Sequence, residues 1–190
     1  MSDIQPSRLL PALFENLDDS LPLTVLDLGP AQPETLEFFS TYRCKLHFCD
    51  LYQDLPLKAG EDGEPSLDAR LEEVLALPGG ALFDICFFWD LPHFLSRDAV
   101  SRLMGKLRPH LHPDSRGHCF APHNTKTPAA AVCHGIADVR HFSVRKRRAM
   151  PPGYQPHPQG ELGALLRYLQ VERSVLLPDR RIELLLKVTR

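Results

Sequence analysis

The chain has 190 residues, of which 43% are hydrophobic and 24% are charged, with a formal net charge of -2. This length can close one sizeable core, whereas two independent domains would both be undersized, so we expect residues 1–190 to form a single domain. No stretch approaches the roughly 20 uninterrupted apolar residues of a membrane span, and the first residues lack a basic segment followed by an apolar run, so we expect a cytoplasmic protein.

The first predicted elements form a βαβ unit. After a short amphipathic opening over residues 9–17, the apolar run LTVLDL (23–28) predicts a strand covered on both faces. Gly29 and Pro30 end this strand, and the spacing of apolar residues over 33–42 predicts a helix. A second apolar strand, KLHFCDL (45–51), follows directly. Strand, tight turn, helix and strand within about 30 residues are typical of a nucleotide-binding βαβ unit.

The middle of the chain continues this alternation of helices and strands. Residues 54–68 are polar and predict an exposed loop, and the periodicity of residues 69–77 slightly favours a helix. The segment GGALFDICFFWD (79–90) is the clearest strand in the sequence. A helix over 97–111, capped by Ser96, and a short strand over 117–121 complete this region.

The last part of the chain begins with an irregular segment. Residues 122–158 contain six prolines and a basic run, so we expect a long irregular loop inside the domain, as in functional lids. A helix over 160–170 and an antiparallel pair of strands over 171–177 and 181–190 close the chain. Together the elements predict an α/β three-layer sandwich with a mostly parallel twisted sheet and a C-terminal antiparallel hairpin.

Four segments resemble the class I S-adenosylmethionine-dependent methyltransferases. VLDLGPA (25–31) is similar to the first motif of that family, and LHFCDL (46–51) to its second strand. Residues 72–95 are similar to the segment that runs through the family's fourth strand, and residues 107–120 to the stretch that leads into its fifth. The resemblance implies a Rossmann-like fold, S-adenosylmethionine as a cofactor, and a methyl acceptor that the sequence does not identify.

Candidate cofactor residues follow from the expected strand ends. In an open parallel sheet, ligands bind beyond the carboxyl ends of the strands, where Asp27, Gly29 and Asp50 are expected to meet. Gly29 allows a close approach of the backbone, and Asp50 is spaced to accept both hydroxyls of a ribose. Ala31 adds a methyl group where a backbone usually passes close to the cofactor. By resemblance, Glu73 is placed near the adenine.

Candidate catalytic residues follow the strand that ends near residue 90. Asp90 and His93 would face an acceptor as it approaches the methyl group, with His93 as a candidate general base. Capping of the next helix or simple surface exposure is an alternative role for His93. The fragment DLPH lacks the paired prolines and the aromatic residue of the amino-group methyltransferases that act on adenine or glutamine, so that substrate class is not expected.

Cysteine and histidine usage does not predict a metal site or a disulfide framework. The five cysteines are scattered and contain no CxxC pair, so buried reduced thiols are expected. Six of the nine histidines lie between residues 110 and 141, but their spacing fits no zinc finger and no HExxH pattern.

Charge is distributed unevenly along the chain. Residues 1–95 carry 5 Lys and Arg against 17 Asp and Glu, whereas residues 96–190 carry 17 against 7. Either the halves pack with complementary charge, or the second half presents a basic face to an anionic partner. The candidate contact residues for such a partner are Arg145, Lys146, Arg147 and Arg148.

Three functions are compatible with the sequence. The first is an S-adenosylmethionine-dependent methyltransferase on an unidentified acceptor, for which Asp27, Gly29 and Asp50 argue. The second is a catalytically inactive module with the same fold that binds or regulates, for which Ala31 and Pro33 argue because they replace glycines of the motif. The third is a polyanion-binding protein that works through the basic run.

Overall fold

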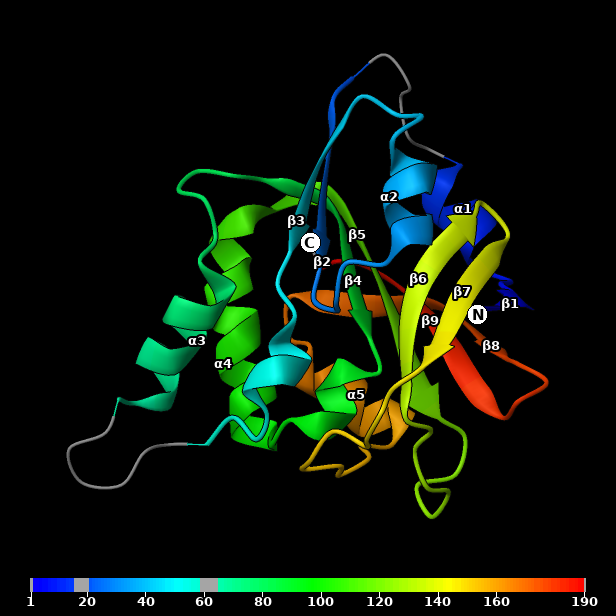
Figure 1. The fold of residues 1–190 in the computed structure, drawn as a ribbon. Coiled ribbons are helices and arrows are strands. Elements are labelled where there is room, and N and C mark those ends of the chain that lie inside the picture. The colour runs from blue at the N-terminus through cyan, green and yellow to red at the C-terminus, as the bar shows by residue number, and fades with distance from the viewer. Residues whose placement is uncertain (1, 16–20, 59–64, 190) are drawn as a thin grey trace.

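The computed structural model describes residues 2–15, 21–58 and 65–189. A six-stranded sheet in the order β3-β2-β4-β5-β9-β8 forms the centre of the molecule (Figure 1). Strands β2, β3, β4 and β5 run parallel to one another, β9 runs antiparallel to β5, and β8 runs antiparallel to β9. The bounds of these strands are β2 Leu23–Asp27, β3 Cys44–Phe48, β4 Phe83–Trp89, β5 Leu111–Pro122, β8 Leu169–Leu176 and β9 Arg181–Val188. The predicted parallel sheet with a closing antiparallel hairpin is therefore confirmed.

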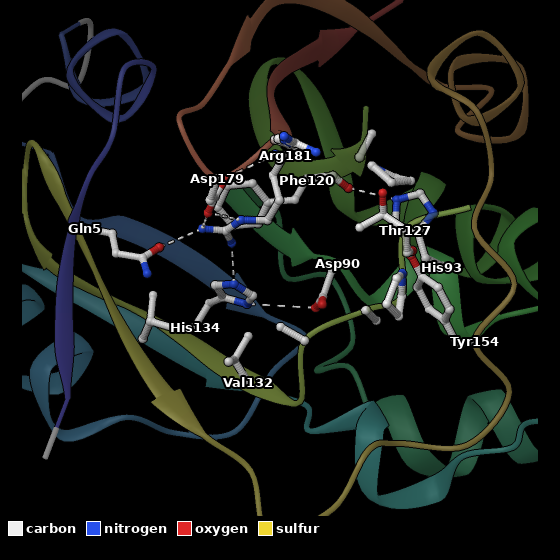
Figure 2. Close-up of a pocket in the computed structure, with 17 residues that line it drawn as sticks. Gln5, Asp90, His93, Phe120, Thr127, Val132, His134, Tyr154, Asp179 and Arg181 are labelled. Carbon is white, nitrogen blue, oxygen red and sulfur yellow. Dashed lines mark hydrogen bonds and ion pairs between the residues drawn. The ribbon is translucent and has the colours of Figure 1, made fainter. Parts of the chain in front are cut away.

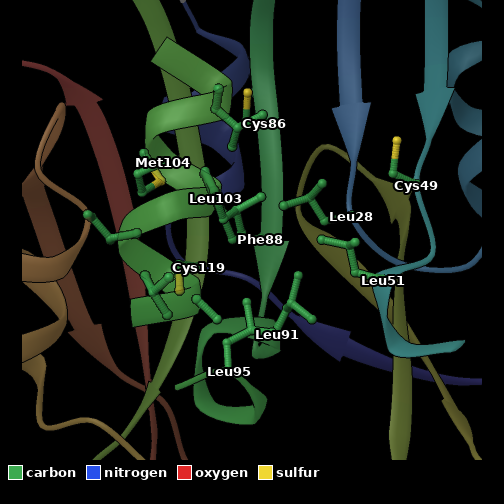
Figure 3. Close-up of a cluster of buried hydrophobic side chains, with 14 of the residues drawn as sticks. Leu28, Cys49, Leu51, Cys86, Phe88, Leu91, Leu95, Leu103, Met104 and Cys119 are labelled. Atoms are coloured by element: carbon green, nitrogen blue, oxygen red, sulfur yellow. The ribbon is translucent and has the colours of Figure 1, made fainter. Parts of the chain in front are cut away.

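Helices cover both faces of this sheet. On one face, α3 (Leu67–Leu75), α4 (Arg97–Leu107) and α5 (Gln159–Leu165) pack on a large apolar cluster that includes Cys86 and Phe88 of β4 (Figure 3). On the other face, α1 (Leu10–Phe14) and α2 (Pro33–Phe39) pack with Phe87 and Trp89 of β4. Side chains alternate across a strand, so a strand buried on both faces needs the continuous apolar run that β4 has.

Short 3₁₀ turns connect the strands to the helices. They are η1 (Leu51–Asp54) after β3, η2 (Leu91–Phe94) after β4 and η3 (Arg108–His110) before β5. Ser66 and Ser96 cap α3 and α4 by accepting hydrogen bonds from the amides of Ala69 and Ala99. In the described part of the chain, every helix is too short or too polar to cross a membrane.

The region predicted to be an irregular loop contains a β-hairpin. Strands β6 (Val132–Asp138) and β7 (His141–Lys146) pair with each other, and β7 also pairs with β1 (Asp3–Pro6), which the sequence analysis did not predict. The turn between β6 and β7 is fastened by Asp138, whose Oδ1 accepts a hydrogen bond from the Arg140 amide at 2.7 Å. The expectation for residues 122–158 is thus corrected for residues 132–146. The strand expected at 117–121 also begins earlier, at Leu111.

Candidate functional site

Three acidic residues follow neighbouring strands at the carboxyl edge of the sheet. Asp27 is the last residue of β2, Asp50 comes two residues after β3, and Asp90 comes directly after β4. Asp27 and Asp50 are close enough for the charge of Asp50 to raise the pKa of Asp27. The strand ends thus bring these side chains to one edge, where ligands bind in open α/β sheets.

Asp27 is buried at this edge of the sheet, at the end of β2. Its Oδ1 accepts hydrogen bonds from the Gly29 amide at 2.8 Å and from the Trp89 indole Nε1 at 2.7 Å. Burial raises the pKa of Asp27 to about 7, although both hydrogen bonds act to lower it. Asp27 therefore changes its charge near neutral pH.

Trp89 lies against the glycine turn. A Cβ atom on Gly29 would lie 3.1 Å from Cδ1 and 3.3 Å from Nε1 of the Trp89 indole, so a larger residue at this position would require the ring to move by a few tenths of an ångström. The ring stacks between Phe87 and His134, with centroid distances of 5.0 and 5.6 Å. The backbone of Trp89 has a φ of 53°, a value that residues with large side chains rarely adopt. The sequence analysis missed this residue, although it is the single tryptophan of the chain.

Asp50 presents an open hydrogen-bond acceptor. Its Oδ2 accepts a hydrogen bond from Gln53 Nε2 at 2.7 Å, whereas Oδ1 is buried and has no hydrogen-bond partner in the described part of the chain. Buried carboxylate oxygens are normally satisfied, so a group with hydroxyl or NH donors fits here. Ala31, the other predicted residue of this edge, is exposed.

The β6–β7 hairpin is fastened to the first turn of α2. Thr35 Oγ1 accepts a hydrogen bond from the Ile136 amide at 2.9 Å, and Arg145 Nη2 pairs with Glu34 Oε1 at 2.6 Å. A Cβ atom on Gly135 would lie 2.9 Å from Cβ of Gln32, so the two backbones approach closely. The hairpin therefore covers the amino end of α2.

A cavity of about 210 Å³ lies beyond the ends of β4 and β5 (Figure 2). Asp90 reaches its wall, and its Oδ1 accepts a hydrogen bond from the Tyr52 hydroxyl at 2.5 Å. Burial raises the pKa of Asp90, although the bond from Tyr52 acts to lower it. His134 Nδ1 lies 3.8 Å from the same oxygen, and His134 Nε2 accepts a hydrogen bond from Arg181 Nη1 at 2.6 Å.

His134 is an uncharged imidazole in this arrangement. Burial and then the charge of Arg181 hold the pKa of His134 well below its usual range. Since an arginine can only donate, Nε2 is the acceptor and the ring proton is on Nδ1, the atom that faces Asp90. Tyr52, His134 and Arg181 come from three distant segments, and the sequence analysis did not select them as site residues.

His93 also lines the cavity, but both of its ring nitrogens are bonded to the backbone. Nε2 donates to the Phe120 carbonyl at 2.9 Å, and Nδ1 accepts from the His157 amide at 3.0 Å. Burial lowers the pKa of His93 to about 4. These contacts favour a structural role at η2. The expected alternatives of surface exposure and helix capping do not hold, because His93 is buried and Ser96 caps α4.

Glu73 is apart from the other predicted residues. It is an exposed residue of α3 and lines a shallow depression with Asp54 and Arg70. Neither Asp27 nor Asp50 lines that depression.

Two of the four residues in the basic run point inward. Arg145 pairs with Glu34, while the guanidinium of Arg147 lies 4.1 Å from the centroid of the Tyr52 ring; Lys146 and Arg148 are exposed. Other ion pairs also join the acidic first half to the basic second half, among them Lys106 with Glu72. Complementary packing therefore accounts for part of the charge asymmetry.

Comparisons with known proteins relate the chain to methyltransferase structures. No protein-family model and no curated protein sequence matches it. Among solved structures, it is similar to 1,6-didemethyltoxoflavin-N1-methyltransferase from Burkholderia thailandensis, crystallised with its substrate and S-adenosylhomocysteine (TM-score 0.51, 19% identity, 96% of this chain and 78% of that one).

Two further structures give a similar result. The CcbJ methyltransferase from Streptomyces caelestis has a TM-score of 0.51 at 12% identity, over 95% of this chain and 94% of that one. The PH0226 protein from Pyrococcus horikoshii has a TM-score of 0.54 at 13% identity, over 95% and 88%. At such identities the similarity establishes the fold alone. The chain has the class I S-adenosylmethionine-dependent methyltransferase fold.

Proposed function

We propose that the protein is an S-adenosylmethionine-dependent methyltransferase that binds its cofactor across the ends of β2 and β3. The observation that carries this proposal is the unpaired, buried Oδ1 of Asp50, two residues after the second strand of the βαβ unit. A ribose hydroxyl would supply the hydrogen bond that this oxygen lacks. The fold similarity supports the choice of cofactor.

The residues of the edge fit the cofactor at its ribose end. Asp50 would hold the ribose hydroxyls, and the turn at Gly29 would let the backbone approach the ligand. Ala31 is exposed, and Pro33 begins α2 at the position where a missing NH costs least. At Gly29, however, the Trp89 indole lies in contact with the turn, so the ligand must approach beside this ring or displace it. An adenine contact of Glu73 stays a prediction.

The side chains around the cavity would prepare the acceptor. Bound S-adenosylmethionine supplies an electrophilic methyl group, and its transfer requires mainly an acceptor atom held in line. Asp90 would hold or remove the acceptor proton, and Tyr52 orients this carboxylate by its hydrogen bond. We propose that His93 is a positioning residue, because its two backbone hydrogen bonds fix the η2 turn that carries Asp90.

Calorimetric titration with S-adenosylmethionine and S-adenosylhomocysteine tests the proposal. Because Trp89 is the single tryptophan and contacts Gly29, its emission should change in the same titration. We expect micromolar binding that Asp50→Ala weakens by about 10- to 100-fold, since hydrogen bonds to a charged group are lost. Asp54→Ala, at an exposed carboxylate of η1, is the matched control and should bind as the wild type does. Absence of heat and of any emission change at millimolar ligand would overturn the proposal.

A non-catalytic binding module is the second candidate. It is favoured by the contact of Trp89 with Gly29 and by the attachment of the hairpin to α2. If the wild type fails to bind either ligand while Trp89→Leu binds both, the indole closes the site and this candidate is correct. An anionic partner at Lys146 and Arg148 stays a prediction, for which binding should weaken steeply with salt.

A further inference from the structure

The cavity beyond β4 and β5 has the size and the walls of a site for a small planar molecule. An apolar cavity of roughly 150 Å³ accommodates benzene, and this one measures about 210 Å³. Most of its wall is apolar, and two aromatic rings contribute to it (Figure 2). The apolar residues of the wall include Phe120, Pro128, Ala129, Val132, Val144 and Tyr154. Walls of this kind favour flat aromatic ligands.

Arg181, one of the two arginines on this wall, is already paired. Arg181 Nε and Nη2 both lie within 2.7 Å of Asp179 Oδ2, and Nη2 also donates to Gln5 Oε1 at 2.8 Å. Its Nη1 donates to His134, and the guanidinium lies 4.2 Å from the centroid of the Phe120 ring. An anionic ligand would therefore gain little from Arg181 and would lie near the carboxylate of Asp90.

Asp90 is an open polar group on the cavity wall. Oδ1 accepts the hydrogen bond from Tyr52, whereas Oδ2 accepts none from another described residue. The side chain is 18% exposed, and it belongs to the cavity wall. The Nδ1 proton of His134 lies too far away, at 3.8 Å from Oδ1, to satisfy the carboxylate by a direct hydrogen bond. A ligand that places an NH or OH group at Oδ2 would complete the hydrogen bonding of Asp90.

We infer that this cavity binds a small, uncharged aromatic or heteroaromatic molecule that donates one N–H or O–H hydrogen bond to Asp90. Its role as the methyl acceptor rests on the proposed function, but its binding does not. The donor atom is the one that would carry the methyl group, because it lies at the ends of β4 and β5 beside the proposed cofactor edge. A carboxylate or phosphate group placed at the position of this donor is disfavoured, because it would face the Asp90 carboxylate.

Indole and benzofuran form a matched pair of probes for this inference. The two bicyclic molecules have nearly the same shape, but indole has an N–H donor where benzofuran has an oxygen atom. We expect indole to bind the wild-type protein about ten-fold more tightly than benzofuran in an NMR titration, with shifts at the amides of Ala129, Val132 and Tyr154. Asp90→Asn should abolish the preference because the amide group can present its own donor. Asp114→Asn, at an exposed residue outside the cavity wall, should retain it.

The outcomes separate this inference from the proposed function. Equal affinity for the two probes, no binding of indole at millimolar concentration, or an unchanged preference in Asp90→Asn would overturn the inference. The titrations are repeated with S-adenosylhomocysteine present. If S-adenosylhomocysteine binds but indole does not, only the present inference fails. If indole is preferred but neither cofactor form binds, only the methyltransferase proposal fails.

Discussion

The buried carboxyl group of Asp27 makes the stability of the protein depend on pH, and Asp27→Asn tests this directly. Its pKa is raised from 3.8 to about 7, chiefly by burial. Between these two values the folded protein holds a proton that the unfolded chain has released, so stability must fall as pH rises through this window. Three pKa units correspond to about 4 kcal/mol in total, of which roughly 2 to 3 kcal/mol is lost between pH 5 and pH 8.

The substitution preserves the hydrogen bonds around the group. The amide oxygen of an asparagine can accept from the Gly29 amide and from Trp89 Nε1, as Oδ1 of Asp27 does. Asp27→Asn removes the carboxyl group that titrates. Any effect of the new amide group on the free energy of unfolding is the same at both pH values, so it cancels when the two values are compared. We therefore expect the variant to gain roughly 2 to 3 kcal/mol relative to the wild type on going from pH 5 to pH 8.

Urea unfolding at pH 5 and pH 8 measures this difference. The free energies of unfolding of the wild type and Asp27→Asn are compared at each pH, and their difference should change by the stated amount. Asp98→Asn, the same change at an exposed residue of α4, is the control and should leave the pH dependence of the wild type unchanged. Parallel pH profiles for the wild type and Asp27→Asn would refute the assignment of a raised pKa to this carboxyl group.

Further predictions concern packing. Glu183 is fully buried and accepts hydrogen bonds from His118 and from the N-terminal segment, so Glu183→Gln should lower the free energy of unfolding by about 3 kcal/mol. Glu172→Gln, on the neighbouring strand β8, removes only partly exposed ion pairs with Arg116 and Lys187 and should change it by less than about 1 kcal/mol. Equal effects of the two substitutions would contradict a stabilising role of the Glu183 hydrogen bonds. Gly135→Ala should cost about 1 to 3 kcal/mol because its Cβ would lie 2.7 to 2.9 Å from three side-chain atoms. Gly105→Ala, in an open part of α4, should instead stabilise by about 0.5 to 1 kcal/mol in the same urea assay, and destabilisation would refute this.

The sheet could be predicted from the sequence because its strands are continuous apolar runs. Such a run marks a strand buried on both faces, and its polar end marks the edge where Asp27, Asp50 and Asp90 lie. The hairpin at 132–146 could not be predicted in this way. It buries His134, Gly135 and Ser143 among its apolar residues, which interrupts the alternation that identifies a strand.

The chemistry of the site was less predictable than its position. The local fragment around His93 suggested a base, but only the fold shows that both ring nitrogens are bonded to backbone groups. Tyr52 and His134 reach Asp90 from segments that lie 38 and 44 positions away in the sequence, so no local pattern connects them. The sequence does draw attention to Trp89, because it is the single tryptophan and lies at a predicted strand end. Its position beside Gly29, however, depends on an unusual backbone angle that the sequence does not reveal.

The pairing of β1 with β7 has a consequence for the order in which the protein assembles. Asp3 lies opposite Val144, and Gln5 contacts Arg181, 176 positions further along the chain. Contacts between residues so distant in sequence are slow to form, because a large loop must close before they stabilise anything. During synthesis, the wall of the cavity that includes Gln5 and Arg181 can be completed only after β9 has been made. A nascent chain in which β9 has not yet been made would therefore lack the part of the cavity wall that Arg181 provides.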